Sequence, residues 1–199
     1  FTRHYGDEFT CNLEECMLFD VIRQVSTGLT EIGVVTIFSD GEALALRKLE
    51  DAGLEFNLIL RRPLHAIIGP QNPLYHEERE SVTLEELREF PCVINYASPG
   101  DFSGERIWEG GARRNAEVVV SDLGSALQIV SRTGAVAIDT YDAETYRTFY
   151  AANDCKYLAL KDAPIDCKLG WVMPKNHTLS QACGEFLEIL REKAELTAR

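Results

Sequence analysis

The feature that most constrains the fold is a nearly continuous run of β-branched and aromatic residues, Val34-Val35-Thr36-Ile37-Phe38. Such a run predicts a strand buried on both faces, as in a sheet that is covered by helices. Directly before it, apolar residues recur at helical spacing over residues 18–25, and Gly28 ends that predicted helix. A helix that leads into a buried strand is typical of an α/β fold.

The rest of the chain continues this alternation of strands and helices. Alternation of this kind favours a largely parallel sheet. The polar, proline-containing segment 70–80 and a return near 171–176 predict two α/β lobes, with the final helix packed on the first. We expect lobe I to hold residues 1–70 and 174–199, and lobe II to hold 71–173. The remaining predicted strands are 54–60, 65–69, 92–96, 116–120, 135–138, 157–160 and 169–173, and the predicted helices are 83–87, 123–130 and one from 178 or 180.

Two helix starts carry local capping signals. Thr83 is a good N-cap, and Glu86 stands three residues later as its capping-box partner. Either Ser121 or Asp122 is suited to cap the helix that begins at Leu123.

Composition excludes some classes of protein. The 199 residues are 45% hydrophobic and carry a formal charge of −12, so no basic surface for nucleic acid is indicated. No apolar run approaches the roughly 20 residues that span a bilayer, and the start has no signal-peptide pattern. We therefore expect a cytoplasmic protein without a membrane partner.

No constellation of catalytic or metal-ligating residues is recognisable. The six cysteines have no two-residue spacing, which favours reduced thiols and leaves Cys11 and Cys16 as the pair most worth checking. The four histidines are scattered, and there is no nucleophile elbow or P-loop. We expect no enzyme activity, no cofactor and no metal.

The order of segments resembles the regulatory domain of LysR-type transcriptional regulators. Residues 28–33, Gly-Leu-Thr-Glu-Ile-Gly, resemble the family's "G.lDlai", with Glu31 in place of the usual aspartate. The most specific piece is the sequence from His65 to Leu74 followed by 82–87, which resembles "l.lv.p..hpla…vtleeL". Residues 1–15 and the return strand with the last helix, 169–187, complete the resemblance.

The resemblance implies two Rossmann-like lobes with mixed sheets, the type 2 periplasmic-binding-protein architecture, and a ligand cleft between the lobes. A small-molecule effector, commonly an organic acid, would bind there. The family's domain normally has a strand and most of a helix before the position of Phe1, so lobe I would lack its first strand. The winged helix-turn-helix would lie outside this chain, and DNA would be bound only through it.

The resemblance also suggests which residues line the effector site. Leu18 stands where the family often has a hydroxyl, which weakens a grip on a carboxylate, and an ordinary core role is an equal alternative. For residues 97–101 an ordinary turn, and for Ser121 or Asp122 a helix cap, is the alternative to a role in ligand binding. Asp139 would favour a cationic or hydroxyl-bearing ligand. The candidates are Cys16, Met17, Leu18 and Thr36 on the first lobe, and Tyr96, Ala97, Ser98, Gly100, Ser121, Asp122, Ser125, Asp139 and Thr140 on the second.

Family members pair into homodimers or homotetramers. Here helices 18–27 and 123–132 would form the contact, with Phe19 or Ile129 buried in it. The main rival is a free-standing solute-binding protein of a transporter, which would be a monomer. An enzyme built on the same fold is a second rival, but it would need convergent acid and base residues in the cleft.

Overall fold

The computed structural model describes residues 5, 12–39, 41–95, 117–120, 122–140, 153–162 and 166–197. Contacts between residues divide the chain into two compact units. Unit 1 holds Phe1–Ile37, Glu42–Leu60 and Lys168–Arg199, and unit 2 holds Phe38–Gly41 and Arg61–Cys167. Besides the short excursion Phe38–Gly41, the chain passes from one unit to the other inside two long strands, β2 (Leu54–Ile68) and β8 (Asp166–Pro174).

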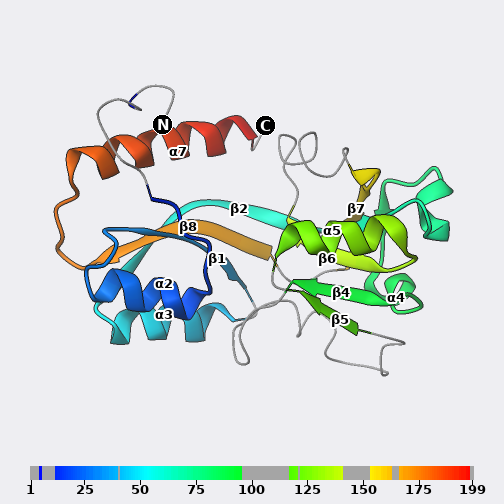
Figure 1. The fold of residues 1–199 in the computed structure, drawn as a ribbon, viewed down its shortest axis with the longest axis horizontal. Helices are drawn as coiled ribbons and strands as arrows, with labels where there is room; N and C mark the ends of the chain where they lie inside the picture. Colours follow the sequence, from blue (N-terminus) through cyan, green and yellow to red (C-terminus); the bar gives the residue numbers. More distant parts are fainter. Residues whose placement is uncertain are drawn as a thin grey trace. The chain divides into compact units, whose positions relative to one another are not determined.

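Unit 1 is a sheet with helices on both faces (Figure 1). The helix α2 (Leu18–Ser26) packs on one face, because a Cβ at Gly33 of β1 (Gly33–Phe38) would overlap Val21. On the opposite face α7 (Gln181–Thr197) contributes Leu187 to a cluster with Trp171 and Met173 of β8. Strand alternation places Val35 and Ile37, both buried, on the side of α2.

One sequence prediction needs correction, and one helix of unit 1 was not predicted. The segments 54–60 and 65–69 are one strand, β2, rather than two. Pro63 is tolerated inside it because the pairing with β6 and β7 begins only at Leu64 and His65. The helix α3 (Glu42–Asp51) was not predicted, because its apolar residues Leu44 and Leu46 are exposed and blur the helical pattern.

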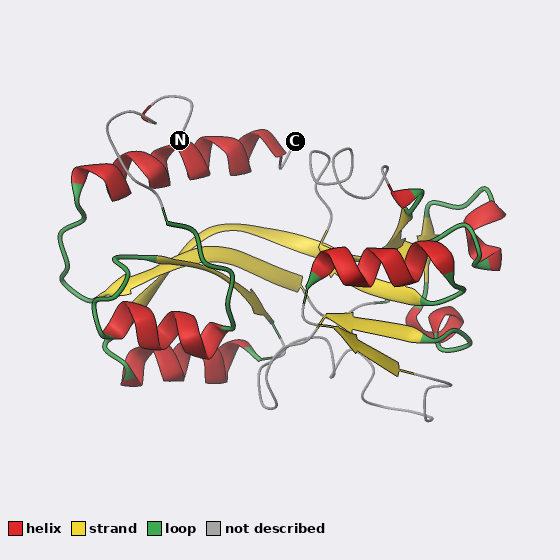
Figure 2. Cartoon of the chain, viewed as in Figure 1, coloured by secondary structure: helices red, strands yellow, loops and turns green. Residues whose placement is uncertain are grey.

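Unit 2 is built around a mixed set of strands (Figure 2). The second half of β2 pairs antiparallel with β6 (Val136–Thr140) and β7 (Lys156–Leu160). In contrast, β4 (Cys92–Asn95) is parallel to both β5 (Glu117–Val120) and β6, and β3 (Ser81–Val82) is parallel to β7. The sheet is therefore mixed, as the family resemblance implied, and not largely parallel as the alternation alone suggested. The remaining elements are α4 (Leu84–Leu87), α5 (Leu123–Arg132) and the 3-10 helix η1 (Pro73–His76).

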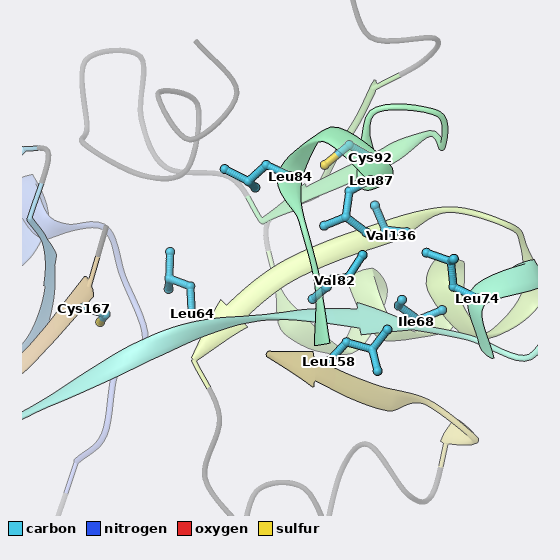
Figure 3. Close-up of a cluster of buried hydrophobic side chains, with 11 residues drawn as sticks. Leu64, Ile68, Leu74, Val82, Leu84, Leu87, Cys92, Val136, Leu158 and Cys167 are labelled. Atoms are coloured by element: carbon cyan, nitrogen blue, oxygen red, sulfur yellow. The ribbon is translucent and has the colours of Figure 1, made fainter. Parts of the chain in front are cut away.

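Apolar side chains fill both faces of the unit 2 strands. On one face Leu64, Ile68, Val82 and Leu158 meet Leu87 of α4 (Figure 3). On the other face α5 covers the strands, and its fully buried Leu127 and Val130 pack with the buried Ile67, Val93 and Ala137. Among the described helices, none is long and apolar enough to cross a membrane.

Short-range signals were reliable in unit 2. Thr83 accepts from the Glu86 N–H at 3.2 Å, and the Glu86 carboxylate accepts from the Thr83 N–H at 2.8 Å, which confirms the capping box. The Glu86 carboxylate also accepts from Arg79 at 2.6 Å. The Arg79 guanidinium and the Thr83 donors lower the pKa of Glu86 to about 2.

Candidate functional site

The carboxyl ends of three parallel strands meet at one edge of unit 2. Because β4 is parallel to β5 and to β6, Asn95, Val120 and Thr140 end their strands at the same side. The carboxyl edge of parallel strands is the usual ligand edge in open α/β folds. Four of the predicted effector residues follow or end these strands: Asp122, Ser125, Asp139 and Thr140.

At this edge Asp122 is the N-cap of α5, which confirms one of the two predicted capping residues. One carboxylate oxygen accepts from the Ser125 N–H at 2.8 Å, and the other accepts from the Ser125 hydroxyl at 2.8 Å. These two hydrogen bonds, backbone first, lower the pKa of the exposed Asp122 carboxyl. The start of α5 therefore already has an anionic acceptor from its own chain.

Asp139 and Thr140 end β6 and are half-buried. The Asp139 carboxylate accepts from the Thr140 N–H at 2.7 Å. In the antiparallel pairing with β2, Asp139 lies directly opposite His65, so both side chains belong to the same face. Burial lowers the pKa of His65. This favours a neutral imidazole at the position opposite Asp139, near the end of β6. His65 was not among the predicted site residues, because only the strand register brings it opposite Asp139.

Some predicted residues of the second lobe lie outside the described part of the chain. They are Tyr96, Ala97, Ser98, Gly100 and Ser121.

In unit 1 the predicted residues Cys16, Met17 and Leu18 form the start of α2. Met17 is the N-cap in an extended conformation and makes no side-chain cap hydrogen bond. The Cys16 sulfur accepts from the Gln24 amide at 3.9 Å. Burial, together with the charges of Glu14 and Asp20, raises the pKa of the Cys16 thiol, so the thiol is neutral at pH 7. The first turn of α2 thus receives no acceptor from its N-cap side chain.

Thr36 lies on a different face of the unit 1 sheet from α2. It is exposed, whereas its neighbours Val35 and Ile37 are buried on the α2 side. The structure therefore does not bring Thr36 onto the surface on which α2 packs.

Two polar contacts hold unit 1 together over long sequence separations. Lys168 of β8 is buried and forms an ion pair with Glu42, the first residue of α3. Glu31, which stands at the family's aspartate position, accepts from both the backbone N–H and the hydroxyl of Ser180 at the start of α7. Burial would raise the pKa of Glu31, but the Ser180 hydrogen bonds and the nearby His177 hold it below its usual value.

Among the residues that the structure describes, no group of three or more His, Cys, Asp or Glu side chains is placed to hold a metal ion. The arrangement offers hydrogen-bonding groups at a strand edge and at a helix start, which suits binding of a small polar molecule.

Comparison with known proteins identifies the family. Residues 19–195 match the family model of the LysR substrate binding domain, and the chain belongs to that family. A comparison with curated protein sequences gave no significant match.

Solved structures of LysR-type regulators have the same fold. The effector-binding domain of QuiR in complex with shikimate is 14% identical, with a TM-score of 0.65 over 90% of this chain and 79% of that one. The BenM effector-binding domain with benzoate is also 14% identical, with a TM-score of 0.68 over 98% and 82%. Full-length CbnR complexed with its target DNA is 16% identical, with a TM-score of 0.64 over 92% and 59%.

The chain therefore spans about three fifths of the length of this full-length regulator. The family match gives no support to the alternative of a transporter's solute-binding protein.

Proposed function

We propose that this chain is the effector-sensing part of a longer LysR-type regulator, that it binds a small metabolite between its two lobes, and that it catalyses no reaction. The observation that carries the proposal is the family match over residues 19–195. The polar carboxyl edge of unit 2 supports it, because ligands of open α/β folds bind at such an edge. The structures of QuiR with shikimate and of BenM with benzoate support a small organic acid as the class of effector.

The hydrogen-bonding groups at the start of α2 and at the end of β6 narrow the class of effector that we propose. The start of α2, where Met17 supplies no acceptor, favours a carboxylate oxygen that accepts from first-turn N–H groups. The end of β6, where Asp139 stands in register with His65, favours a hydroxyl or ammonium group. We therefore propose an effector with a carboxylate at one end and a hydroxyl or amino group at the other. The residues that stay in the proposed site on the family resemblance alone are Tyr96, Ala97, Ser98, Gly100, Ser121 and Thr36.

The proposed mechanism is a shift between two lobe arrangements. An effector shifts that balance only if it binds one arrangement more tightly than the other. In the longer protein the shift would change the geometry of an oligomer that carries DNA-binding domains in the cytoplasm. The complex of CbnR with its target DNA supports this role for a regulator of the family.

The proposed oligomer contacts are α2 and α5, as homodimer or homotetramer. Within one chain, Phe19 already lies under the Lys48 ammonium, 3.6 Å from the ring centroid, and Ile129 packs against the buried cluster of α5. Both are half-buried, so an oligomer would bury only their remaining surface. A monomeric mass by light scattering at micromolar concentration would contradict this part of the proposal.

A thermal-shift screen tests the effector site. The chain is heated with a panel of hydroxy acids, amino acids, plain carboxylic acids and amines. A ligand that binds only the folded state at 100 times its Kd stabilises it by about 2.7 kcal/mol, which is a measurable rise in Tm. The compound that raises Tm most is then tested on Asp139→Asn, with Asp51→Asn on the exposed end of α3 as the matched control.

The expected result is that a hydroxy or amino acid gives the largest rise, that Asp139→Asn reduces it and that Asp51→Asn does not. A panel in which no compound raises Tm, or a rise equal in both variants, would contradict the proposed site.

A further inference from the structure

The first turn of α7 is held by residues that lie far apart in the sequence. Ser180 is the N-cap, because its carbonyl accepts from the Gly184 N–H at 2.9 Å and its hydroxyl accepts from the Cys183 N–H at 3.3 Å. The Ser180 N–H donates to the carboxylate of Glu31, and the Ser180 hydroxyl donates to the same carboxylate at 2.7 Å. Since Glu31 comes just before β1, these hydrogen bonds join the start of α7 to the segment that leads into β1.

These contacts form a capping box that is completed across the fold. In an ordinary capping box, a Glu or Gln at the third helical position accepts from the N–H of the N-cap residue. The helix α4 follows this rule, because Glu86 accepts from the Thr83 N–H at 2.8 Å. The third position of α7 is Cys183, and Glu31, 149 positions before Ser180, supplies the carboxylate instead. The helix α7 therefore completes its cap only when its start lies against the segment before β1.

Apolar packing accompanies the capping box on both sides. Ile32, next to Glu31, and Leu179, next to Ser180, are both partly buried against the cluster that contains Trp171. A hydrophobic residue directly before an N-cap commonly packs in this way and fixes the angle at which the chain enters the helix. The capping box thus lies beside an apolar contact, and opening the box would weaken that contact as well.

The strength of this contact depends on the charge of Glu31. The titratable groups of the described residues that face its carboxylate are His177, with Nε2 at 3.5 Å, and the Cys183 thiol, which hydrogen-bonds to it. Burial would raise the pKa of Glu31, but the hydrogen bonds from Ser180 and Cys183 and the charge of His177 lower it. A carboxyl group whose pKa is lowered by folding stabilises the folded state above the ordinary carboxyl range. That contribution is lost as the pH falls through the lowered pKa.

We propose that Glu31, Ser180 and His177 form a proton-sensitive clasp, which holds the start of α7 on unit 1 and releases it when Glu31 takes up a proton. A protonated carboxyl group has less capacity to accept the two Ser180 hydrogen bonds, and it no longer attracts the His177 imidazolium. In this clasp Glu31 is a positioning residue for α7. The clasp uses residues of unit 1 alone and includes neither Asp139 nor the start of α2, so the inference does not rest on the proposed effector site.

Hydrogen exchange measured by mass spectrometry tests the clasp without any ligand. Protection factors are compared for the first turn of α7 and for α2, which belongs to the same unit. Glu31→Gln keeps the size of the side chain and removes its charge. It is expected to lower the protection of the first turn about tenfold at pH 7, which corresponds to the loss of one charge-assisted hydrogen bond. Glu188→Gln removes a charge at an exposed position of the same helix and is expected to leave the protection unchanged.

The pH profile separates a proton-sensitive clasp from a purely structural contact. As the pH is lowered from 7 to about 3, the first turn of α7 in the parent chain is expected to lose protection until it matches Glu31→Gln, while α2 stays protected. The variant itself is expected to show no such dependence. His177→Gln is expected to lower the protection about twofold at pH 5, because this ion pair is largely exposed and contributes little.

The proposal is overturned if Glu31→Gln and Glu188→Gln give equal protection at pH 7, or if the first turn of the parent chain keeps its protection throughout the acid range. It is also overturned if the first turn and α2 lose protection together, because α7 and the sheet would then open as one unit. Unchanged protection of α2 at pH 7 shows that each variant is folded. Should Glu31→Gln fail this control, the pH profile of the parent chain decides the question alone.

Discussion

At the start of α5 the chain supplies its own acceptor, whereas at the start of α2 it supplies none. Asp122 occupies the N-cap of α5 and uses both carboxylate oxygens on Ser125. Met17 occupies the N-cap of α2 and makes no side-chain hydrogen bond. Both helices pack on a sheet, but α2 carries Asp20 in its first turn whereas α5 has no acidic residue there.

This difference distinguishes a helix start that its own chain stabilises from a helix start that we propose to bind a ligand. An internal carboxylate at α5 satisfies the first-turn N–H groups and the helix dipole, and it would repel a second anion. At α2 the N-cap side chain supplies no acceptor. Burial first, and then the charges of Glu14 and Asp20, raise the pKa of the nearby Cys16 thiol. We therefore propose the start of α2 as the place that binds the carboxylate of the effector.

The largest effect is expected from the packing that keeps the start of α5 in place. Leu127 is fully buried, so Leu127→Ala is expected to lower the free energy of unfolding by about 3 kcal/mol. Leu29→Ala, at a residue that is 72% exposed, is expected to change it by less than about 0.5 kcal/mol. Urea denaturation measures both. Equal effects would mean that α5 is not anchored as described.

The cap itself is tested by Asp122→Ala, which is expected to lower Tm at pH 7. The pKa of Asp122 is lowered in the folded state, so its contribution is present above the ordinary carboxyl range and is lost as pH falls through the lowered pKa. The difference in Tm between parent and variant should therefore shrink in acid. Asp122→Asn retains a good cap but removes that pH dependence, and it is the matched control. A difference that grows in acid would contradict the assignment.

The comparison is tested further by a substitution that gives α2 an N-cap acceptor like that of α5. Met17→Asn supplies the missing cap acceptor and is expected to raise the free energy of unfolding by at most about 1 kcal/mol. The same change is expected to weaken binding of a carboxylate effector, because the first-turn N–H groups then have a partner. Calorimetry with and without the effector measures both quantities. A variant that binds more tightly would place the carboxylate elsewhere.

The smallest expected effect concerns the acidic surroundings of the α2 start. The raised pKa of Cys16 predicts slow alkylation by iodoacetamide at pH 8, since the thiolate is the reactive form. Asp20→Asn removes one of the charges that raise this pKa, so the rate should increase about twofold. Mass spectrometry of the Cys16 peptide gives the rate separately from that of Cys183. An unchanged or slower rate would show that Asp20 does not act on the thiol.

Local signals made much of the fold predictable. The β-branched run of β1, the capping box at Thr83 and the cap at Asp122 each depend on residues close in sequence, and the structure confirms them. The continuity of β2 through Pro63 was not predictable, because proline reads as a break unless the pairing partners are known.

The polar contacts of the site were predictable only in part. Asp139 was proposed from its place at a strand end, but its neighbour His65 follows from the register with β2. The contact of Glu31 with Ser180 joins residues that are 149 positions apart, and the ion pair of Lys168 with Glu42 is also long-range. No spacing rule in one sequence reveals such pairs.

The central proposal is that the start of α2 and the end of β6 each contribute to effector binding. It is tested most directly by calorimetric titration of the best compound from the thermal-shift screen against the parent chain, Met17→Asn, Asp139→Asn and the double variant. We expect each single change to raise Kd about tenfold and the double change about a hundredfold, with all four proteins folded. An unchanged Kd in the double variant would contradict the account.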